Sequence, residues 1–527
     1  MRLFLARAGI VGAVALVGVF LLPAAGTSRA VKEGGTFRMA ESQPFGSADP
    51  VHTGNYGAFR LACGTLMGYP SKPLPDGLRL VPDLAASNPR ISQNGLAYTF
   101  LVRRSARFST GQPVTAADVK HTLERILTPA LQSEVAYLFE DVVGARTMSL
   151  GKAASLAGVT ANGRTLTIRL VRPVPDLPAR TTQLCIVPSA LQADPEGAKA
   201  PIPSAAPYYV SEFVPGERLT IERNPYYGGR RPHHVDRIVE EFGVEPDAGL
   251  DAVSNGQLDF YPVVPGARID QLVRDYGINR SRLFVEQSLA GRMFFLNTSR
   301  PLFRDNAALR RAVNFAVDRA ALIREFGRGA TATDQILPPK VPGFRNEKIY
   351  PLGRPDVRRA RALAAGHLRK GKAVLYTCTD PGYCVAPAQV LQRNLAAIGL
   401  RVEIKTFPFG IYFQKAKTLG EPYDIILIGW AGGYNDPREF LLLFDGRSGA
   451  QNYSRFNSPA FNRLLDAAGR LSGPARYKAY GSLDVRLIRD EAPAIPYAVY
   501  NDWTFVSDRV GCVVTNPSLD LTAVCLK

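Results

Sequence analysis

Residues 423–437 (Tyr-Asp-Ile-Ile-Leu-Ile-Gly-Trp-Ala-Gly-Gly-Tyr-Asn-Asp-Pro) join a short apolar run directly to a glycine-rich loop. The four aliphatic residues 425–428 do not alternate with polar ones, which is typical of a strand covered on both faces in a parallel sheet. Ligands of such sheets bind beyond the carboxyl ends of the strands, where residues 429–433 fall. The stretch therefore predicts a buried strand and a binding loop, although an ordinary strand exit has the same pattern.

A βαβ unit precedes this strand. Residues 373–376 (Ala-Val-Leu-Tyr) are predicted as a strand, and residues 386–398 as a helix, because apolar residues recur there at helical spacing. Gly399 supplies a C-terminal cap. Residues 400–407 then alternate apolar and polar, which predicts a second strand. The sequence therefore predicts an α/β chain with a parallel sheet.

The first thirty residues predict an exported protein. Two arginines flank the start of an apolar run, residues 8–22, which is followed by small residues up to Ala30. A basic head, a short apolar stretch and a small-residue end are typical of a secretory signal peptide, with a mature start near Val31; an uncleaved membrane anchor is the alternative. No Cys lies in residues 1–62, so we expect no lipid-modified cysteine near the cleavage point.

Six cysteines agree with export, because an oxidising compartment lets an even set form disulfides. Two pairs are local in sequence, and the remaining two residues form a long-range pair. The expected bonds are Cys378 with Cys384, Cys512 with Cys525, and Cys63 with Cys185. Fifteen connectivities are possible, so this pairing is an expectation. Metal binding or redox chemistry is the alternative, but no Cys-x-x-Cys occurs.

The charge pattern does not indicate a nucleic-acid partner. The formal net charge is +18, and +15 without the three arginines of the predicted signal peptide. Basic residues are scattered among acidic ones and do not alternate with aromatic residues, which favours a solvated basic surface. About five hundred mature residues imply two or three domains.

Other elements are predicted outside the βαβ unit. Thr115 begins a helix that ends at Leu127, because Asp118 stands at the capping-box position. Strands are expected at residues 36–40, 98–102, 165–170 and 219–222, and the last thirty-odd residues return to strand and loop.

Several separate segments carry a resemblance to a known family. They are residues 80–87 (Leu-Val-Pro-Asp-Leu-Ala-Ala-Ser), 95–100, 108–119 (Phe-Ser-Thr-Gly-Gln-Pro-Val-Thr-Ala-Ala-Asp-Val), 206–210, 223–227 (Arg-Asn-Pro-Tyr-Tyr), 296–300, 312–319, the Trp430 loop and 456–462. In this order and at these distances, they resemble the solute-binding proteins of ABC importers, in the large peptide, nickel-chelate and opine family. The resemblance covers nearly the whole mature chain.

The resemblance implies an α/β fold of the bilobed periplasmic-binding-protein type (class II, cluster C-like) with an extra α+β domain. Lobe I is expected from residues 31–68, 186–290 and 491–527, the extra domain II from residues 69–185, and lobe III from residues 291–490. Such a clamp closes over one solute without reacting groups, so we expect no enzyme activity, no catalytic residue, no cofactor and no metal. The implied partners are a short peptide or similar polar solute and the permease and ATPase subunits of the importer, with the chain itself a monomer in the periplasm or outside the cell.

The resemblance also implies which residues reach the solute. Gln43 and Phe45 are expected from lobe I and Tyr137 from domain II. From lobe III we expect Phe409, Tyr412, Trp430, Ala431, Gly432, Gly433, Tyr434 and Asp436. For each aromatic residue, core packing is the alternative, more so for Phe45 and Phe409 than for the tyrosines, whose hydroxyls need a polar partner.

The loop departs from the family pattern at Gly433. In the family's peptide binders the third residue after the loop tryptophan is an aspartate that pairs with the free amino group of the peptide. Gly433 has no carboxylate, so we expect no demand for a free amino terminus; Asp436 is close enough in sequence to offer another carboxylate.

The sequence motifs that resemble enzyme sites do not support an enzyme over a solute-binding protein. Residues 366–372 match most of a phosphate-binding loop, but Ala373 stands where Ser or Thr is needed and a strand follows the match instead of preceding it. His233 and His234 are adjacent, so their side chains diverge, and a polar surface turn is favoured over a metal pair. A secreted hydrolase, or a peptide-binding chaperone or sensor on the same frame, remains the alternative function.

Overall fold

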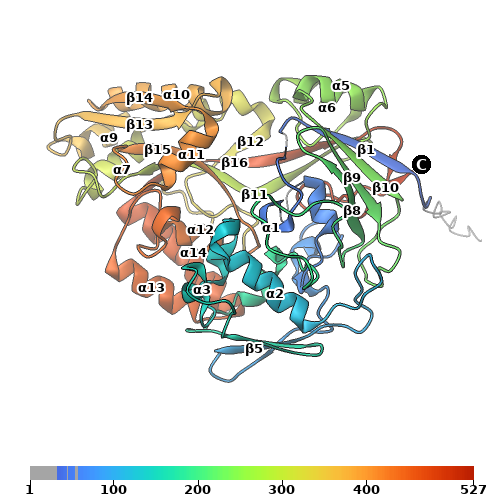
Figure 1. Ribbon diagram of the computed structural model, residues 1–527. Helices are drawn as coiled ribbons and strands as arrows, with labels where there is room; N and C mark the ends of the chain where they lie inside the picture. The colour runs from blue at the N-terminus through green and yellow to red at the C-terminus, as the bar shows by residue number, and fades with distance from the viewer. Residues whose placement is uncertain (1–31, 44, 54–56) are drawn as a thin grey trace, which may run out of the picture. The chain divides into compact units, whose positions relative to one another are not determined.

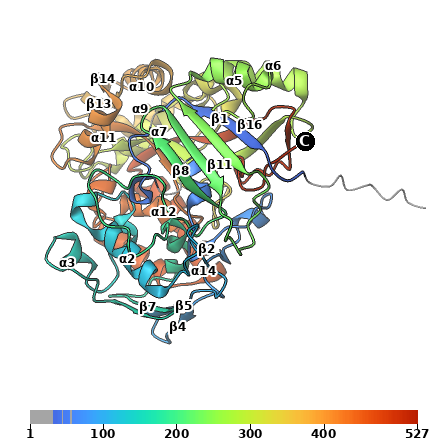
Figure 2. The same cartoon turned by 45° about the vertical axis from the view of Figure 1, so that its right-hand side comes forward.

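The computed structural model describes residues 32–43, 45–53 and 57–527. The predicted signal peptide, residues 1–30, and its cleavage point lie outside the described residues. Residues 32–527 form one compact unit. Figure 1 shows its sheets and helices, and Figure 2 shows them turned by 45°.

A six-stranded mixed sheet forms the centre of what we call the six-stranded body. The strand order is β12 (Ala330–Ala332), β16 (Ala494–Phe505), β11 (Leu283–Leu296), β15 (Ile425–Ala431), β13 (Lys372–Cys378) and β14 (Arg401–Phe407). The helices of this body are α7 (Ala307–Ala316), α9 (Val357–Ala364), α10 (Ala386–Ala396), α11 (Phe409–Lys417), α12 (Arg438–Leu441), α13 (Pro459–Gly469) and α14 (Gly473–Arg486).

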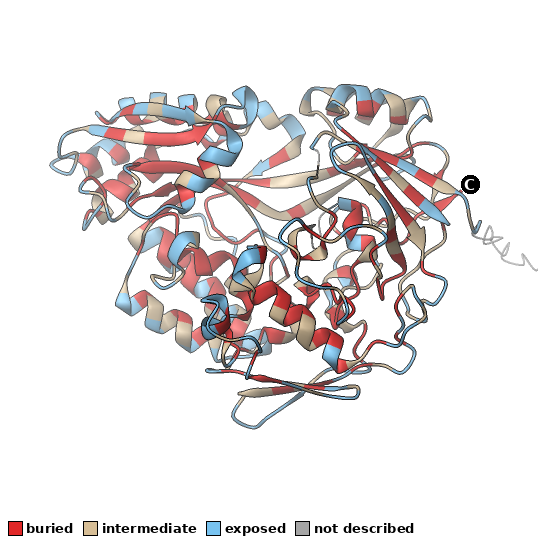
Figure 3. Ribbon diagram, viewed as in Figure 1, coloured by how far each residue is buried: buried red, intermediate tan, exposed pale blue. Residues whose placement is uncertain are grey.

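The predicted βαβ unit is confirmed. Strands β13 and β14 are parallel, with Leu375 beside Ile404, and α10 connects them. Leu375 also lies beside Ile425 of β15, again in parallel. The four aliphatic residues of β15 are buried, as the sequence predicts for a strand covered on both faces. Figure 3 shows buried residues along these strands and exposed residues on the outer faces of the helices.

Two expectations about the Tyr423 stretch are corrected. The sheet is only partly parallel, because the other neighbour of β15 is β11, which runs antiparallel to it. The strand is also longer than expected: Trp430 and Ala431 still pair with Gly291 and Ala290 of β11. A long partner strand extends the ladder past Gly429, so the loop begins at Gly432.

Strands β11 and β16 are long and connect two hydrophobic cores. Phe294 and Ile495 pack in the core of the six-stranded sheet. At the opposite ends of the same two strands, Leu283 and Phe505 pack with Ala40 and Tyr261 in a separate core. These strands therefore cross from one body of the fold to the next.

The four-stranded body contains the sheet β1 (Thr36–Glu41), β10 (Arg237–Phe242), β9 (Arg218–Arg223) and β8 (Tyr208–Val214), in that order. Strand β1 runs parallel to β10, although about 200 residues separate them. The expected strands at 36–40 and 219–222 are confirmed. Helices α5 (Pro246–Ser254) and α6 (Gly266–Tyr276) belong to the same body.

A separate hydrophobic core belongs to what we call the α2 body. Its sheet has the order β4 (Arg90–Ile91), β5 (Ala97–Leu101), β7 (Thr165–Arg169) and β6 (Val159–Asn162), and its helices are α2 (Ala116–Leu127) and α3 (Ala145–Ser149). The predicted capping box is confirmed, because Thr115 and Asp118 bond each other at the start of α2. The predicted strands at 98–102 and 165–170 form to within a residue.

The remaining short α-helices and strands are α1 (Pro50–Thr53), α4 (Leu177–Arg180), α8 (Arg319–Leu322), β2 (Met67–Gly68), β3 (Val81–Pro82), β17 (Val510–Gly511) and β18 (Cys525–Leu526). The division of the chain into lobe I, domain II and lobe III at the expected residue boundaries stays a prediction. In the described chain, no helix has the length and apolar character needed to cross a bilayer.

All three expected disulfides are present. Cys63 bonds Cys185 across 122 residues, Cys378 bonds Cys384, and Cys512 bonds Cys525. His234 contacts Glu33 at 2.8 Å, and the ring of His233 lies against the carbonyl of Arg231. Among the described residues no cluster suited to a metal ion occurs.

Candidate functional site

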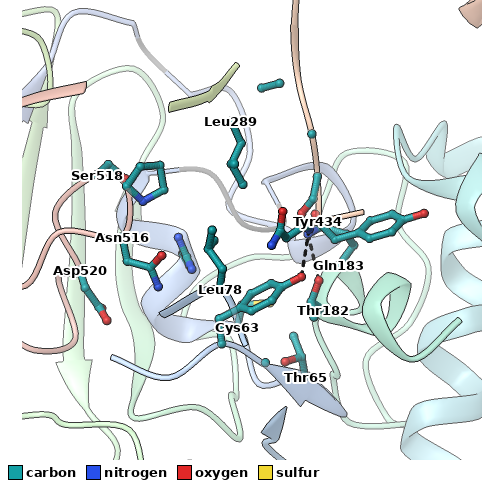
Figure 4. A pocket seen from close by; sticks show the side chains of 18 of the residues that line it. Cys63, Thr65, Leu78, Thr182, Gln183, Leu289, Tyr434, Asn516, Ser518 and Asp520 are labelled. Atoms are coloured by element: carbon teal, nitrogen blue, oxygen red, sulfur yellow. Dashed lines mark hydrogen bonds between the residues drawn. The ribbon is translucent and has the colours of Figure 1, made fainter. Parts of the chain in front are cut away.

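A cavity of about 380 Å³ lies where segments far apart in the sequence meet. Figure 4 shows Asn516, Ser518 and Asp520 on one side of it and Thr182, Gln183 and Tyr434 on the other. Its wall comes from residues 50–83, from the end of the α2 body, from Leu289 on β11 and from the loop after β15. No single body of the fold forms this cavity alone.

A second cavity, of about 680 Å³, adjoins the first. It lies between the β1 strand, residues 260–269, Phe326, Tyr383 and residues 500–504 of β16. The two cavities share the wall residues Arg60, Arg231, Asp502, Ser518, Asp520 and Thr522. Both volumes fall within the range of roughly 300–1,000 Å³ typical of sites for small organic ligands.

The glycine-rich loop lines the first cavity. Ala431, Gly432, Gly433 and Tyr434 contribute to its wall, together with Asn435. The loop is held from both sides. The backbone N–H of Asn435 donates to the hydroxyl of Tyr69 at 3.0 Å, and the side-chain amide of Gln183 donates to the carbonyl of Gly433. The carboxyl end of a buried strand therefore forms part of the cavity wall, in the position that the sequence pattern indicates.

Trp430 is half-buried behind this wall. Its indole N–H donates to the backbone carbonyl of Glu439 at 2.8 Å, and its ring packs on the core of the six-stranded body. Trp430 does not line either cavity. The predicted contact of Trp430 with a solute stays a prediction; in this structure the side chain supports the loop.

Glu439 carries a buried carboxylate next to the loop. Its Oε2 accepts from the hydroxyl of Tyr137 at 3.2 Å and from the backbone N–H of Gly433 at 3.3 Å. Burial raises the pKa of Glu439 to about 7, against the opposing effect of Arg438 and Arg180. Tyr137 thus reaches across from the α2 body to the loop region, but it lines neither cavity.

Tyr434 and Asp436 belong to a buried charge network. The hydroxyl of Tyr434 donates to Asp176 at 2.6 Å, and Arg476 lies 3.3 Å from Asp176 and 2.9 Å from Asp436. Burial would raise the pKa of Asp176, but Arg180 and Arg476 hold that pKa well below its usual range. The carboxylate of Asp436 is therefore already paired with Arg476, and Asp436 does not line either cavity.

The other four predicted residues lie outside the two cavity walls. Phe45 packs edge-on against Phe59, with ring centroids 5.2 Å apart, in the four-stranded body. Gln43 is exposed. Tyr412 is buried in the core of the six-stranded body, whereas Phe409 on α11 is 57% exposed. Solute contacts of these residues stay predictions.

Among the lining residues that sequence reasoning missed are the four charged residues of the wall that the two cavities share: Arg60, Arg231, Asp502 and Asp520. Asp502 is the one charged residue of a mostly apolar and aromatic strand, Ala494–Phe505, and an acidic residue in such a strand is a usable signal. The other three lie in short helices and loops without periodicity, so their position depends on how the chain folds back.

Comparisons with known proteins agree with this architecture. Residues 79–452 match the family described as bacterial extracellular solute-binding proteins, family 5 Middle. The chain is 25% identical over 447 residues to the oligopeptide-binding protein OppA of Bacillus subtilis (strain 168), covering 80% of each sequence. It is 24% identical over 449 residues to the periplasmic murein peptide-binding protein MppA of Escherichia coli (strain K12), covering 81% of each.

Solved structures show the same fold. The clavulanic acid biosynthesis oligopeptide binding protein 2 superimposes with a TM-score of 0.82 at 26% identity, over 94% of this chain and 96% of that one. The Escherichia coli murein tripeptide binding protein MppA superimposes with a TM-score of 0.77 at 20% identity, over 94% and 99%. The predicted bilobed α/β fold is confirmed, and the chain belongs to family 5 of the bacterial extracellular solute-binding proteins.

Proposed function

We propose that this protein captures a short peptide, or a comparably polar organic solute, in the two adjoining cavities and delivers it to an ABC permease driven by ATPase subunits. The observation that carries this proposal is the composition of the first cavity, whose wall combines residues from separate bodies of the fold. Relatives of the chain are named as oligopeptide-, dipeptide- and murein peptide-binding proteins.

The wall composition supports a clamp mechanism. A solute that contacts Gln183 of the α2 body, Asn435 of the loop after β15 and Asp520 of the C-terminal segment gains all of these contacts only when the bodies are close together. Binding therefore favours the closed arrangement by the free energy of the contacts that the open arrangement lacks. A permease that recognises the closed arrangement would then receive loaded protein selectively.

The same proposal extends to organisation and location. We place lobe I in residues 31–68, 186–290 and 491–527, domain II in 69–185, and lobe III in 291–490. The protein acts as a monomer in the periplasm or outside the cell, without a lipid anchor and without catalytic turnover. A secreted hydrolase or a peptide-binding chaperone or sensor is not favoured by the family to which the chain belongs.

Native mass spectrometry of the purified protein, followed by calorimetry with an equimolar library of tri- to pentapeptides, tests the proposal. We expect one solute per chain, a thermal midpoint that rises with solute concentration, and no product after prolonged incubation. Binding of no peptide in the library would contradict the proposed solute class. Turnover of a peptide that a single substitution abolishes would favour the hydrolase.

A further inference from the structure

Asp502 stands at the wall that the two cavities share. It lies on β16, opposite Glu286 of β11, at the point where the ladder between the two long strands becomes irregular. Its side chain lines both cavities and is half-buried. A group in either cavity can therefore approach the same carboxylate.

The negative charge of Asp502 is only weakly compensated by other groups in the described part of the chain. Its one hydrogen-bond donor there is the hydroxyl of Ser288, and it forms no ion pair with a described residue. Burial raises the pKa of Asp502 to about 6, and the bond from Ser288 only partly offsets this effect. Holding an ionised carboxylate away from water without a counter-charge is unfavourable, and such groups concentrate at functional sites.

Three acidic groups near the loop and the shared wall differ from Asp502 because each has partners. Asp520 accepts from the backbone N–H of Thr522 at 3.0 Å and from its hydroxyl at 2.6 Å, and its charge acts on Arg60. Asp436 is paired with Arg476, and Glu439 is fully buried behind Gly433. Asp502 is thus the acidic group of the shared wall that is free to take a cation from outside the chain.

The shared wall also contains two cationic side chains, Arg231 and Arg60. Arg231 donates to the carbonyls of Cys63 and Arg60, at 2.9 and 3.2 Å. The guanidinium of Arg60 lines both cavities and makes no hydrogen bond or ion pair with another described side chain. The side chain of Arg60 is exposed, so this cation is accessible to a ligand in either cavity. Unpaired charges of both signs on one wall suit a ligand that is itself zwitterionic.

We infer that Asp502 binds a cationic group of the solute, an ammonium or a guanidinium, and that the preferred solute is a peptide carrying at least one such group. A charge-assisted hydrogen bond to a carboxylate that is partly shielded from water is strong and selective. A solute without a cation would cover Asp502 without supplying a counter-charge. This inference rests on the proposed function and names the charge that the solute must carry.

Four forms of one tripeptide test the inference and distinguish the two sources of the cation. The probes are Ala-Arg-Ala, its N-acetylated form, the form with citrulline in place of arginine, and the N-acetylated citrulline form. Citrulline keeps the shape of the arginine side chain without its charge, and acetylation removes the terminal ammonium. Dissociation constants are measured by calorimetry at pH 7.5 for the unaltered protein and for Asp502→Asn, Asp520→Asn and Asp508→Asn. Asp508 is exposed and lines neither cavity, so it controls for the change in net charge.

We expect the N-acetylated citrulline form, which carries no cation, to bind the unaltered protein at least tenfold more weakly than the best of the three cation-bearing forms. Asp502→Asn removes this difference, whereas Asp508→Asn keeps it. Loss of affinity with acetylation identifies the terminal ammonium as the bound group, and loss with citrulline identifies the guanidinium. Loss of the charge preference in Asp520→Asn but not in Asp502→Asn would overturn the assignment to Asp502.

A second measurement follows the affinity against pH, for the unaltered protein and for Asp502→Asn. Affinity for Ala-Arg-Ala falls as the pH is lowered from 7.5 to 5, because Asp502 becomes protonated, and Asp502→Asn lacks this part of the dependence. The comparison is needed because Glu41 on β1 lines the second cavity and, with Glu240 on β10, also has a raised pKa. Equal affinity for the forms with and without a cation would overturn the inference and leave the proposed function intact; binding of no library peptide would contradict both.

Discussion

The carboxylate of Glu439 lies beside the space that a side chain at position 433 would occupy. A Cβ atom added to Gly433 would be 3.5 Å from Oε2 of Glu439 and 3.5 Å from Cδ of Gln183. The backbone N–H of Gly433 also donates a hydrogen bond to Oε2 of Glu439. The loop therefore has a carboxylate next to position 433 although residue 433 itself has none.

Gly433→Asp is expected to destabilise the protein. It places a second carboxylate next to the buried one of Glu439, and like charges at this distance in a poorly solvated site repel. We expect the free energy of unfolding to fall by about 1–3 kcal/mol in urea denaturation. Gly433→Ala is the matched control, because its Cβ makes only ordinary contacts and should change stability by less than about 1 kcal/mol. Recovery of the loss in Gly433→Asp/Glu439→Gln supports this cause, and an equal loss in Gly433→Ala would contradict it.

Arg476 joins two parts of the fold. It pairs with Asp176 at the end of the α2 body and with Asp436 in the loop after β15. Arg476→Met leaves these buried carboxylates short of a counter-charge, and we expect a loss of roughly 3–5 kcal/mol in the free energy of unfolding.

Arg447→Met is the matched control for Arg476→Met. Arg447 also bridges two aspartates, Asp445 and Asp466, each at 2.8 Å, but its side chain is 55% exposed. Solvent screening limits such pairs to about 1 kcal/mol or less. Denaturation midpoints that fall equally in the two variants would show that burial of the network around Arg476 does not increase its contribution to stability.

The pH dependence of stability is expected to include a contribution from Glu439. Its folded-state pKa of about 7 lies above the ordinary value of 4.5, so between these values the folded state holds a proton that the unfolded chain has lost. The free energy of unfolding therefore falls as the pH rises from about 4.5 to about 7, by roughly 3 kcal/mol from this residue. Glu439→Gln should lack this decrease when both proteins are unfolded in urea at pH 5 and pH 7.5. A decrease of the same size in both proteins would contradict the assignment.

The disulfides are expected to contribute unequally. On the chain-entropy account, the bond from Cys63 to Cys185 closes a long loop and stabilises by about 5 kcal/mol, whereas the bond from Cys378 to Cys384 contributes about 2 kcal/mol. Paired alanine variants of each bond, compared in denaturant, measure the difference. Intact mass before and after alkylation of the folded, secreted protein should show no free thiol; thiols at any of these positions would contradict the assignment.

Local patterns in the sequence were sufficient to predict much of the fold. Periodicity predicts the βαβ unit, and the capping box predicts α2. Each of these signals comes from residues that are close together in the sequence. The parallel pairing of β1 with β10 joins residues about 200 positions apart, and no local pattern specifies it. The extension of β15 through Trp430 depended on the partner strand β11, which periodicity within 423–437 does not show.

The candidate site was predicted only in part. The loop residues 431–434 line the first cavity, because the exit of a buried strand is a recurrent place for a site. Asp436 was expected to offer a free carboxylate, but Arg476, forty residues later, already binds it. Arg60 and Asp502 come from distant segments, and only the folded chain brings their charges to one wall.

Photo-cross-linking tests the central claim most directly. A tripeptide carrying a benzophenone side chain is bound to the protein, irradiated, and its attachment sites are mapped by mass spectrometry. The account predicts attachment at residues that line the two cavities, within 431–435, 500–504 and 516–522, and competition by unlabelled peptide. Attachment confined to the exposed apolar residues Phe409, Ile411 and Leu419, with no competition, would contradict it.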